Sequence, residues 1–441
     1  THPWVNDRVL RLVAEKTAAH GTPDAKQKSE ACSAGILEEY FLWKGRTQSK
    51  LLSLGRGSKY WWKLSRSLLG SKESVCSVPP LKLEDGAWAR TAQTKADAFA
   101  KHFGGKFTVP SLVENVYSAL DVEISGQTEF KAPEEAVCET ILKNVKKDSG
   151  TGPDDIPALS LQKLCKELAK PVHMLGLRML QEGTWPDIWR DHRLVPLHKK
   201  KSRHDAKNYR AIHLTAHLSK VLERFISLCA EPYVVEKCLH GPNQWAYQRR
   251  KGARDALAYL TVRWLIAISS KKKVVLHCAD VAGAFDRVKR DRLIRKIRAK
   301  GLHEKLVALF ASWLKKRRAR VVVGGVASSE LDLDDMIFQG TVLGPCLWNL
   351  FYADVRLACV QAGFDDTIFA DDLNAYREAE ASEDNADLLA QSRNCQSQVH
   401  SWGKANGVGF EPTKESHHIL SRWDPAGENF GLLGVDFEAK L

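Results

Sequence analysis

Two hydrophobic periods alternate along the chain, one typical of strands and one typical of helices. Residues 274–278 form a β-rich run, and residues 367–370 and 373–376 predict two short strands joined by a tight hairpin. Residues 215–229 place apolar side chains at helical spacing and predict a buried helix face. Residues 95–107 predict an amphipathic helix that stops at its paired glycines. Strands and helices are therefore interleaved along the sequence.

The loop of the predicted hairpin contains two adjacent aspartates, Asp371 and Asp372. Neighbouring carboxylates repel each other unless a metal cation or a Lys or Arg side chain lies between them. Asp is also a common turn residue, so a plain surface turn is the alternative interpretation of this loop by itself. A third aspartate, Asp280, follows the strand at 274–278 beside small residues that leave space for a ligand. The sequence thus indicates that Asp280 is well placed to bind a metal ion.

A cationic loop separates the strand that ends at Leu197 from a second strand that begins at Tyr209. The basic residues of this loop are Lys199, Lys200, Lys201, Arg203 and Lys207. A hairpin with so many cations at its tip favours phosphate binding, and a solvated run of charges is the alternative.

Two glycine-bearing loops are candidates for close approach of the backbone to a ligand. Residues 338–345 include Gly340 and lead into an apolar helix predicted at 346–357. We expect the first N–H groups of that helix to be unpaired and to face a ligand. Residues 149–157 form a second turn-rich loop between helical patterns, and a plain connector is its alternative interpretation.

The charge balance favours a polyanionic partner, most simply nucleic acid. The 441 residues include 66 Lys and Arg against 53 Asp and Glu, which is a formal net charge of +13. We expect basic helices at residues 287–300 and 315–320. The ten cysteines show no C-x-x-C pair and no zinc spacing, so reduced thiols are expected. No apolar stretch of 18 residues and no secretory leader is visible, so neither a membrane association nor secretion is expected.

Residues 1–77 are helix-leaning and increasingly basic. Between residues 44 and 72 there are eight Lys or Arg and no acid, with aromatic residues interleaved. One interpretation is a nucleic-acid surface that includes Lys44, Arg46, Trp61, Trp62 and Lys63. The other is a solvated helix whose tryptophans dock on the next domain. The length allows two or three domains, and a first residue other than Met indicates a piece of a longer chain.

Three strings occur in an order that resembles motifs A, B and C of a reverse transcriptase palm. They are D-V-A-G-A-F-D (280–286), Q-G-T-V-L-G-P (339–345) and F-A-D-D (369–372). The likeness is to the enzymes of non-LTR (LINE-type) retrotransposons, and three more strings extend it: N-Y-R-A-I-H-L (208–214), G-T-G-P-D-D-I-P (150–157) and G-L-L-G-V-D-F (431–437). The resemblance covers the chain from about residue 78 to residue 441.

The resemblance implies an α+β fold, a right-hand polymerase with fingers and palm. We expect a small, mainly antiparallel palm sheet packed on helices, with a helical N-terminal extension. The implied boundaries are an extension and linker at 1–77, N-terminal helices and fingers at 78–273, and a palm with inserted fingers segments at 274–441. A thumb, a cysteine-rich tail and an endonuclease are expected to be absent from this stretch.

The implied activity is that of an RNA-directed DNA polymerase acting in retrotransposition, with an RNA template, a DNA primer and deoxynucleoside triphosphates as partners. By resemblance, two Mg²⁺ ions, for which Mn²⁺ can substitute, are bound by Asp280, Asp371 and Asp372, and Lys414 protonates the pyrophosphate. A non-catalytic, nucleic-acid-binding relic or domesticated scaffold of the same fold is the alternative. The expected location is the nucleus or cytoplasm, as a ribonucleoprotein.

The resemblance also assigns a nucleotide site. Lys199 and Arg210 correspond to the residues that grip the triphosphate, and Gln339 and Gly340 to those that support the incoming nucleotide and the templating base. Phe285 falls where a bulky ring would clash with a ribose 2′-hydroxyl and select deoxynucleotides, and a plain core residue is its alternative. An RNA-templated RNA polymerase would instead carry a small or polar residue in place of Phe285.

Overall fold

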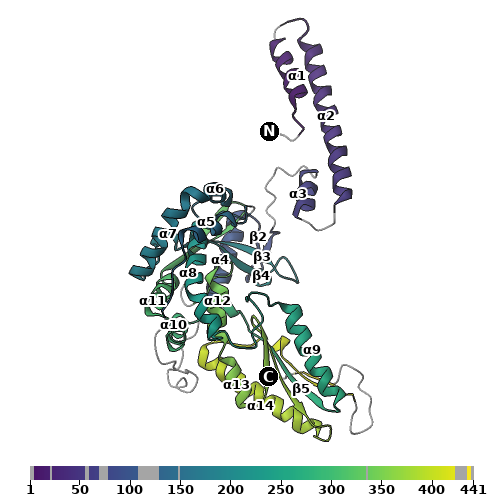
Figure 1. Ribbon diagram of the computed structural model, residues 1–441. Coiled ribbons are helices and arrows are strands. Elements are labelled where there is room, and N and C mark those ends of the chain that lie inside the picture. Colours follow the sequence, from purple (N-terminus) through teal and green to yellow (C-terminus); the bar gives the residue numbers. More distant parts are fainter. Residues whose placement is uncertain are drawn as a thin grey trace. The chain divides into compact units, whose positions relative to one another are not determined.

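The structure is a computed structural model of the chain that describes residues 4–19, 22–54, 59–68, 78–107, 129–147, 149–333, 336–422 and 435–438 (Figure 1). The chain divides into two compact units, residues 1–77 and residues 78–441. Of the strings quoted above, residues 431–434 lie outside the described residues, and so does the side chain of Lys63. None of the helices in the described ranges is both long enough and apolar enough to span a membrane.

The first unit consists of the helices α1 (Asp7–Ala18), α2 (Ala25–Ser53) and α3 (Lys59–Leu68). Helices α1 and α2 form an antiparallel hairpin, in which Arg8 pairs with Glu38 at 2.7 Å and Glu15 pairs with Lys28 at 2.8 Å. The helix-leaning pattern of this region is therefore borne out in the described residues.

The second unit contains a four-stranded sheet with strand order β4-β3-β6-β7. Strand β3 (Asp191–His198) pairs antiparallel with β4 (Tyr209–Leu214) and parallel with β6 (Arg317–Val323), which forms a hairpin with β7 (Val326–Leu333). The prediction of a basic helix at 315–320 is wrong, because residues 317–320 belong to the strand β6. Side chains alternate there between buried and exposed, so Arg317 is buried and Arg318 is exposed. That period of two is the signature of a strand.

The other sheet has strand order β11-β10-β5-β9-β8, and every neighbouring pair is antiparallel. Its strands are β5 (Lys273–Asp280), β8 (Asp365–Phe369), β9 (Asp372–Ala379), β10 (Ser416–Leu420) and β11 (Val435–Glu438). Helix α9 (Ala253–Ser269) packs on the sheet face that carries Val274 and Leu276. Helix α14 (Asn385–Asn406) lies on the opposite side, near α13 (Figure 1).

The remaining helices surround the two sheets. They are α4 (Ala92–Phe107), α5 (Glu135–Lys143), α6 (Ala158–Lys163), α7 (Cys165–Glu182), α8 (His217–Glu236), α10 (Arg290–Ala299), α11 (Glu304–Leu314), α12 (Leu343–Tyr352) and α13 (Val355–Gln361). Two-residue strands β1 (Leu81–Lys82) and β2 (Trp88–Ala89) pair with each other. Helices and small, mainly antiparallel sheets are thus mixed, as an α+β fold requires.

Two expectations about helix ends differ from the structure. The glycines at 104 and 105 do not stop the helix, since α4 runs through them to Phe107. A Cβ at Gly104 would lie 3.3 Å from Leu331, so this glycine permits close packing of α4 on β7. The apolar helix expected at 346–357 is two helices, α12 and α13, with a break between Tyr352 and Val355.

The loop at 149–157 is a connector. A Cβ on Gly152 would lie 2.5 Å from the backbone nitrogen of Ala216, so only glycine lets this loop pass the start of α8. The close approach that the sequence predicts at this loop is an approach to the protein's own backbone.

Candidate active site

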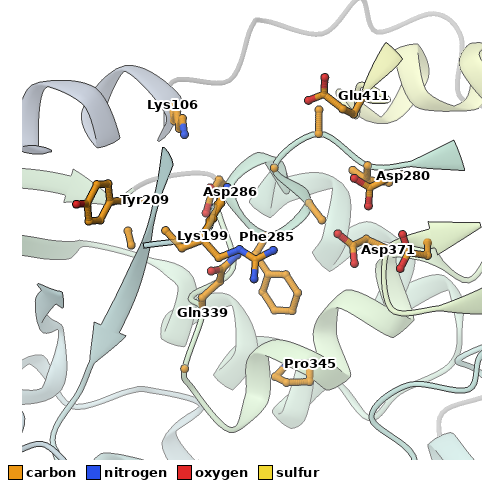
Figure 2. Close-up of a pocket in the computed structure, with 18 of the residues that line it drawn as sticks. Lys106, Lys199, Tyr209, Asp280, Phe285, Asp286, Gln339, Pro345, Asp371 and Glu411 are labelled. Carbon is orange, nitrogen blue, oxygen red and sulfur yellow. The ribbon is translucent and has the colours of Figure 1, made fainter. Parts of the chain in front are cut away.

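Two neighbouring strands bring the three candidate acids together. Asp280 is the last residue of β5 and stands directly opposite Asp372, the first residue of β9. The predicted hairpin loop is displaced by one residue, because Phe369 pairs with Asp372 and leaves Ala370 and Asp371 as the loop. Asp280 and Asp371 therefore face each other across the end of the sheet (Figure 2).

The hairpin loop has an unusual backbone. Ala370 has a φ of +60°, in the left-handed region that glycine adopts freely. For an alanine this conformation costs roughly 1–2 kcal/mol. A two-residue hairpin loop whose first residue has a positive φ normally carries glycine there. The loop that presents Asp371 is consequently strained.

Lys414 reaches the acids from a segment that is held against β5. Glu411 donates its backbone N–H to the carbonyl of Asp280 at 2.8 Å, and Ala282 donates to the carbonyl of Gly409 at 2.9 Å. The 3₁₀ turn Pro412–Lys414 follows, and the ammonium group of Lys414 forms an ion pair with Asp280. The hydrogen bond to Asp280 raises the pKa of Lys414.

The electrostatics of the acids reflect their crowding. Burial and the charge of Asp280 raise the pKa of Asp371. Loss of hydration, a hydrogen bond shared with Asp280 and the charge of Asp371 raise the pKa of Asp372 to about 6. Within the described ranges, no group of three or more His, Cys, Asp and Glu side chains is arranged so that it could hold a metal ion. In this arrangement Lys414 supplies the positive charge beside the acids.

A cleft of about 660 Å³ opens beside these acids. It is lined by every residue assigned above to catalysis, metal binding and nucleotide binding: Lys199, Arg210, Asp280, Phe285, Gln339, Gly340, Asp371, Asp372 and Lys414. The structure therefore brings together in one place residues that are spread along the sequence from Lys199 to Lys414.

The wall opposite the acids is cationic. Lys199 follows β3 and Arg210 lies in β4, so both come from the predicted basic hairpin. Lys106, near the end of α4, also lines the cleft (Figure 2). Burial lowers the pKa of Lys106, while burial and the charges of Lys106 and Arg210 lower the pKa of Lys199. Sequence reasoning missed Lys106, because nothing in its local pattern places it near the motifs.

Asp286 lies among these cations. Burial raises the pKa of its carboxyl to about 6, against the opposing charges of Lys106, Lys199, Arg287 and Arg210. Asp286 thus provides a negative charge that faces Lys106 and Lys199.

Phe285 is at once a packed residue and part of the cleft wall. Its ring is 9% exposed and stacks on Trp348 with ring centroids 5.7 Å apart. Its backbone carbonyl accepts a hydrogen bond from Ile337 at 2.8 Å. The ring is therefore held in a defined position beside the acids, as a group that excludes ligand atoms must be.

The loop with Gln339 and Gly340 rests directly on β4. The backbone N–H of His213 donates to the carbonyl of Gln339 at 2.9 Å. Gly340 has a φ of +101°, and a Cβ there would lie 2.9 Å from the carbonyl oxygen of His213. Both the conformation and the space require glycine.

The expectation of unpaired N–H groups at the start of the following helix is wrong. The carboxylate of Glu223 accepts the N–H groups of Val342 and Leu343 at 2.7 and 3.2 Å. The hydroxyl of Thr341 accepts the N–H of Gly344 at 3.3 Å. A buried glutamate therefore occupies the position in which an anionic ligand was expected.

The candidate nucleic-acid residues of the N-terminus lie in the other unit. Arg46 and Trp62 are exposed, and Lys44 and Trp61 are partly buried. The rings of Trp61 and Trp62 meet edge to face with centroids 4.8 Å apart. These features fit either interpretation of this stretch.

Comparison with known proteins decides the family. The family model described as reverse transcriptase (RNA-dependent DNA polymerase) matches residues 197–437, which is more than half of the chain. The chain belongs to the reverse transcriptase family. The match includes all nine residues that were assigned to the cleft.

The chain is also similar to proteins of mobile elements. The RNA-directed DNA polymerase from mobile element jockey of Drosophila melanogaster is 25% identical over 362 residues, which cover 79% of this chain and 39% of the relative. The retrovirus-related Pol polyprotein from type-1 retrotransposable element R1 of Bradysia coprophila is 27% identical over 267 residues, which cover 60% of this chain and 26% of the relative. The chain spans at most about two fifths of the length of these curated relatives.

Proposed function

We propose that this chain is the polymerase core of a LINE-type retrotransposon and copies RNA into DNA by adding deoxynucleotides to a primer 3′-hydroxyl. The observation that carries the proposal is the convergence of three acids and a cationic wall on one cleft. In-line phosphoryl transfer depends mainly on positioning and on neutralising charge, which these two walls can provide.

Asp280, Asp371 and Asp372 fit a magnesium site, because they offer hard carboxylate oxygens from adjacent strand ends. We assign two Mg²⁺ ions to them, with Asp280 and Asp371 as the main ligands and Mn²⁺ as a substitute. Such ions, when bound, activate the primer hydroxyl and stabilise the leaving pyrophosphate. Lys414 then exchanges its ion pair with Asp280 for the pyrophosphate, to which it donates a proton.

The remaining lining residues hold the nucleotide. Lys199 and Arg210 bind the triphosphate as cations, and the Phe285 ring excludes a ribose 2′-hydroxyl by steric conflict. Gln339 and Gly340 support the incoming nucleotide and the templating base. This assignment selects deoxynucleoside triphosphates as substrates.

In this proposal the four-stranded sheet belongs to the fingers and the five-stranded sheet is the palm of a right-hand polymerase. Residues 78–273 supply the N-terminal helices and much of the fingers, and residues 274–441 supply the palm with inserted fingers segments. Residues 1–77 contribute a basic surface that binds template or primer by charge and stacking.

The direct test is primer extension on poly(rA)·oligo(dT) with Mg²⁺ and dTTP, with wild type beside Asp371→Asn. The expected result is extension by the wild type and a loss of at least about a hundredfold in the variant. Hybrid binding, measured by fluorescence anisotropy, is expected to be retained in both proteins.

Absence of extension by the wild type, with tight hybrid binding, would overturn the catalytic proposal and favour a nucleic-acid-binding scaffold. Equal extension by wild type and Asp371→Asn would overturn the metal assignment alone. Substituting Mn²⁺ for Mg²⁺ in the same assay tests the choice of ion.

A further inference from the structure

Both backbone polar groups of Ala370 are bound by side chains from elsewhere in the fold. The N–H of Ala370 donates to Oε1 of Gln244 at 2.9 Å. The carbonyl oxygen of Ala370 accepts from Nε2 of Gln244 at 3.2 Å and from Nε1 of Trp348 at 2.9 Å. A single residue of the catalytic hairpin is thereby held by three hydrogen bonds.

The amide of Gln244 has one orientation that satisfies its surroundings. Oε1 also accepts the backbone N–H of Ala246 at 3.0 Å, so this oxygen faces two donors while Nε2 faces a carbonyl. Rotating the amide by half a turn would oppose donor to donor and acceptor to acceptor. Gln244 is only 2% exposed, so water cannot replace the lost partners.

The two clamping side chains are themselves fixed. Residues 243–245 run beside β8, where Ile368 donates to the carbonyl of Asn243 and Trp245 donates to the carbonyl of Ile368, both at 2.9 Å. Trp348 lies fully buried in α12, stacked between Phe285 and Tyr352. Neither Gln244 nor Trp348 can follow the hairpin if its loop moves.

The position of this clamp matches the place where the hairpin is least stable by itself. Ala370 carries the positive φ, and Asp371 follows it immediately. If the peptide groups on either side of Ala370 were released, the backbone would relax toward a common conformation and the Asp371 carboxylate would turn with it.

We infer that Gln244 and Trp348 are positioning residues, which hold Ala370 in its strained conformation and so direct Asp371 toward Asp280. The inference rests on the proposed function for its catalytic consequence, but the clamp itself does not depend on activity. Trp348 also joins the clamp to the Phe285 ring, so the metal-binding acid and the sugar-excluding ring share one support.

The first test needs no substrate. Hydrogen exchange at the Ala370 amide is compared in wild type, Gln244→Leu and Trp348→Phe, by mass spectrometry with fragmentation of the hairpin peptide. Gln244→Leu removes the acceptor of this N–H, so its exchange is expected to accelerate by about tenfold or more. Trp348→Phe keeps the stack and removes only the donor to the carbonyl, so a smaller acceleration is expected. Gln396→Leu is the matched control, since Gln396 lies in α14 and bonds His417 of β10, away from the hairpin.

The second test separates positioning from general damage. In primer extension, Gln244→Leu and Trp348→Phe are expected to lower kcat by about tenfold while the KM for dTTP changes by less than about threefold. Gln396→Leu should match the wild type in both parameters.

The two inferences fail in distinguishable ways. Lack of extension by the wild type would count against the proposed function and leave the exchange result to decide the clamp. Unchanged exchange at Ala370 in Gln244→Leu, or a rise in KM with unchanged kcat in both variants, would overturn the clamp. If Gln244→Leu does not fold, Trp348→Phe decides by the same criteria.

Discussion

The buried carboxylate of Glu223 lies 2.7 Å from the backbone nitrogen of Val342 and accepts its hydrogen bond. This contact joins α8 to the start of α12, directly after the loop that carries Gln339 and Gly340. Burial raises the pKa of Glu223, against the charge of Arg317 and the two backbone donors. Val342 at the N-cap has no side-chain acceptor, so the glutamate caps the first turn of α12 together with the hydroxyl of Thr341.

Replacing Glu223 with Ala should destabilise the protein strongly. The change leaves two N–H groups without an acceptor and removes the negative charge that faces buried Arg317, at a cost of roughly 3 kcal/mol or more. Glu223→Gln keeps an acceptor oxygen and should cost only about 1 kcal/mol. Urea unfolding followed by tryptophan fluorescence measures both. Glu330→Ala is the control, because Glu330 forms only partly exposed ion pairs with Arg318 and Arg320. An equal loss of unfolding free energy in Glu223→Ala and Glu330→Ala would contradict the capping role.

Lys106 should contribute to triphosphate binding. It lines the cleft from α4 and faces Asp286 beside Lys199. Lys106→Ala is expected to raise the KM for dTTP on the order of tenfold, corresponding to the loss of one charge-assisted contact, with a smaller change in kcat. Lys106→Arg should preserve most of the affinity.

The control for this prediction lies on the same helix. Lys101 is 76% exposed in its side chain and pairs with Glu84 at 2.6 Å, away from the cleft. Lys101→Ala is expected to leave the KM unchanged. A rise in KM that is the same in both Ala variants would mean that general charge on α4, and not contact in the cleft, attracts the nucleotide.

Two glycines with positive φ allow strain to be separated from collision. Gly340 and Gly325 have φ values of +101° and +82°, but a Cβ at Gly325 would meet nothing within 4 Å. Gly325→Ala is expected to cost about 1 kcal/mol of unfolding free energy, from backbone strain. Gly340→Ala adds a collision with the carbonyl of His213 and should cost about 2–3 kcal/mol. Gly340→Ala should also lower polymerase activity. If the two variants lose the same amount of stability, the His213 carbonyl must shift to accommodate the new Cβ, which would contradict the predicted collision.

Stability should fall in acid through a buried cluster beside the five-stranded sheet. Burial works against ionisation of Glu415, but hydrogen bonds with His277 and His400 lower the pKa of its carboxyl to about 2. A carboxyl whose pKa is lowered on folding stabilises the fold above its unfolded value near 4.5, and this contribution is lost as the pH falls toward 2. The shift corresponds to on the order of 3 kcal/mol.

The partner of Glu415 acts in the opposite direction. Burial lowers and hydrogen bonds with Cys395 and Glu415 raise the pKa of His277, with a net rise above its ordinary value of 6.5. Its contribution is therefore complete below pH 6.5 and is lost as the pH rises through the folded value. We expect maximal stability from this cluster between about pH 5 and 6.5, measured by urea unfolding across pH. In Glu415→Gln the decline between pH 4.5 and 2 should be smaller; an unchanged decline would assign acid sensitivity to other groups.

Much of the candidate site follows from sequence, because its motifs are compact. Asp280 ends a strand and Asp371 sits in a short hairpin, so each acid is presented by its own local pattern. The two acids come close together because β5 pairs with β9. The sequence predicts this pairing only through the family resemblance, since no local pattern indicates it. The hairpin loop is displaced by one residue because Ala370 has a positive φ. Gln244 and Trp348, which lie far from Ala370 in the sequence, stabilise this conformation by hydrogen bonds.

Other features depend on tertiary packing and leave little local trace. Glu223 stands in a helix whose pattern indicates only a buried face, and its role exists because α12 begins next to it. Lys106 enters the cleft because Gly104 lets α4 approach β7. The charge density at 315–320 obscured a strand, because the guanidinium of Arg317 is buried and bonds the carbonyls of Trp313 and Trp189.

The parallel pairing of β3 with β6 governs how this molecule can come apart. Between these strands the chain builds β5, and after β7 it returns to supply β8 to β11. The strands of each sheet are therefore not consecutive in the chain. A single cut in the backbone cannot separate all strands of one sheet from all strands of the other. Unfolding of either sheet therefore pulls on chain segments that lead directly into strands of the other sheet. The two halves of the cleft, acid and cationic, are interlocked and should melt in one cooperative step.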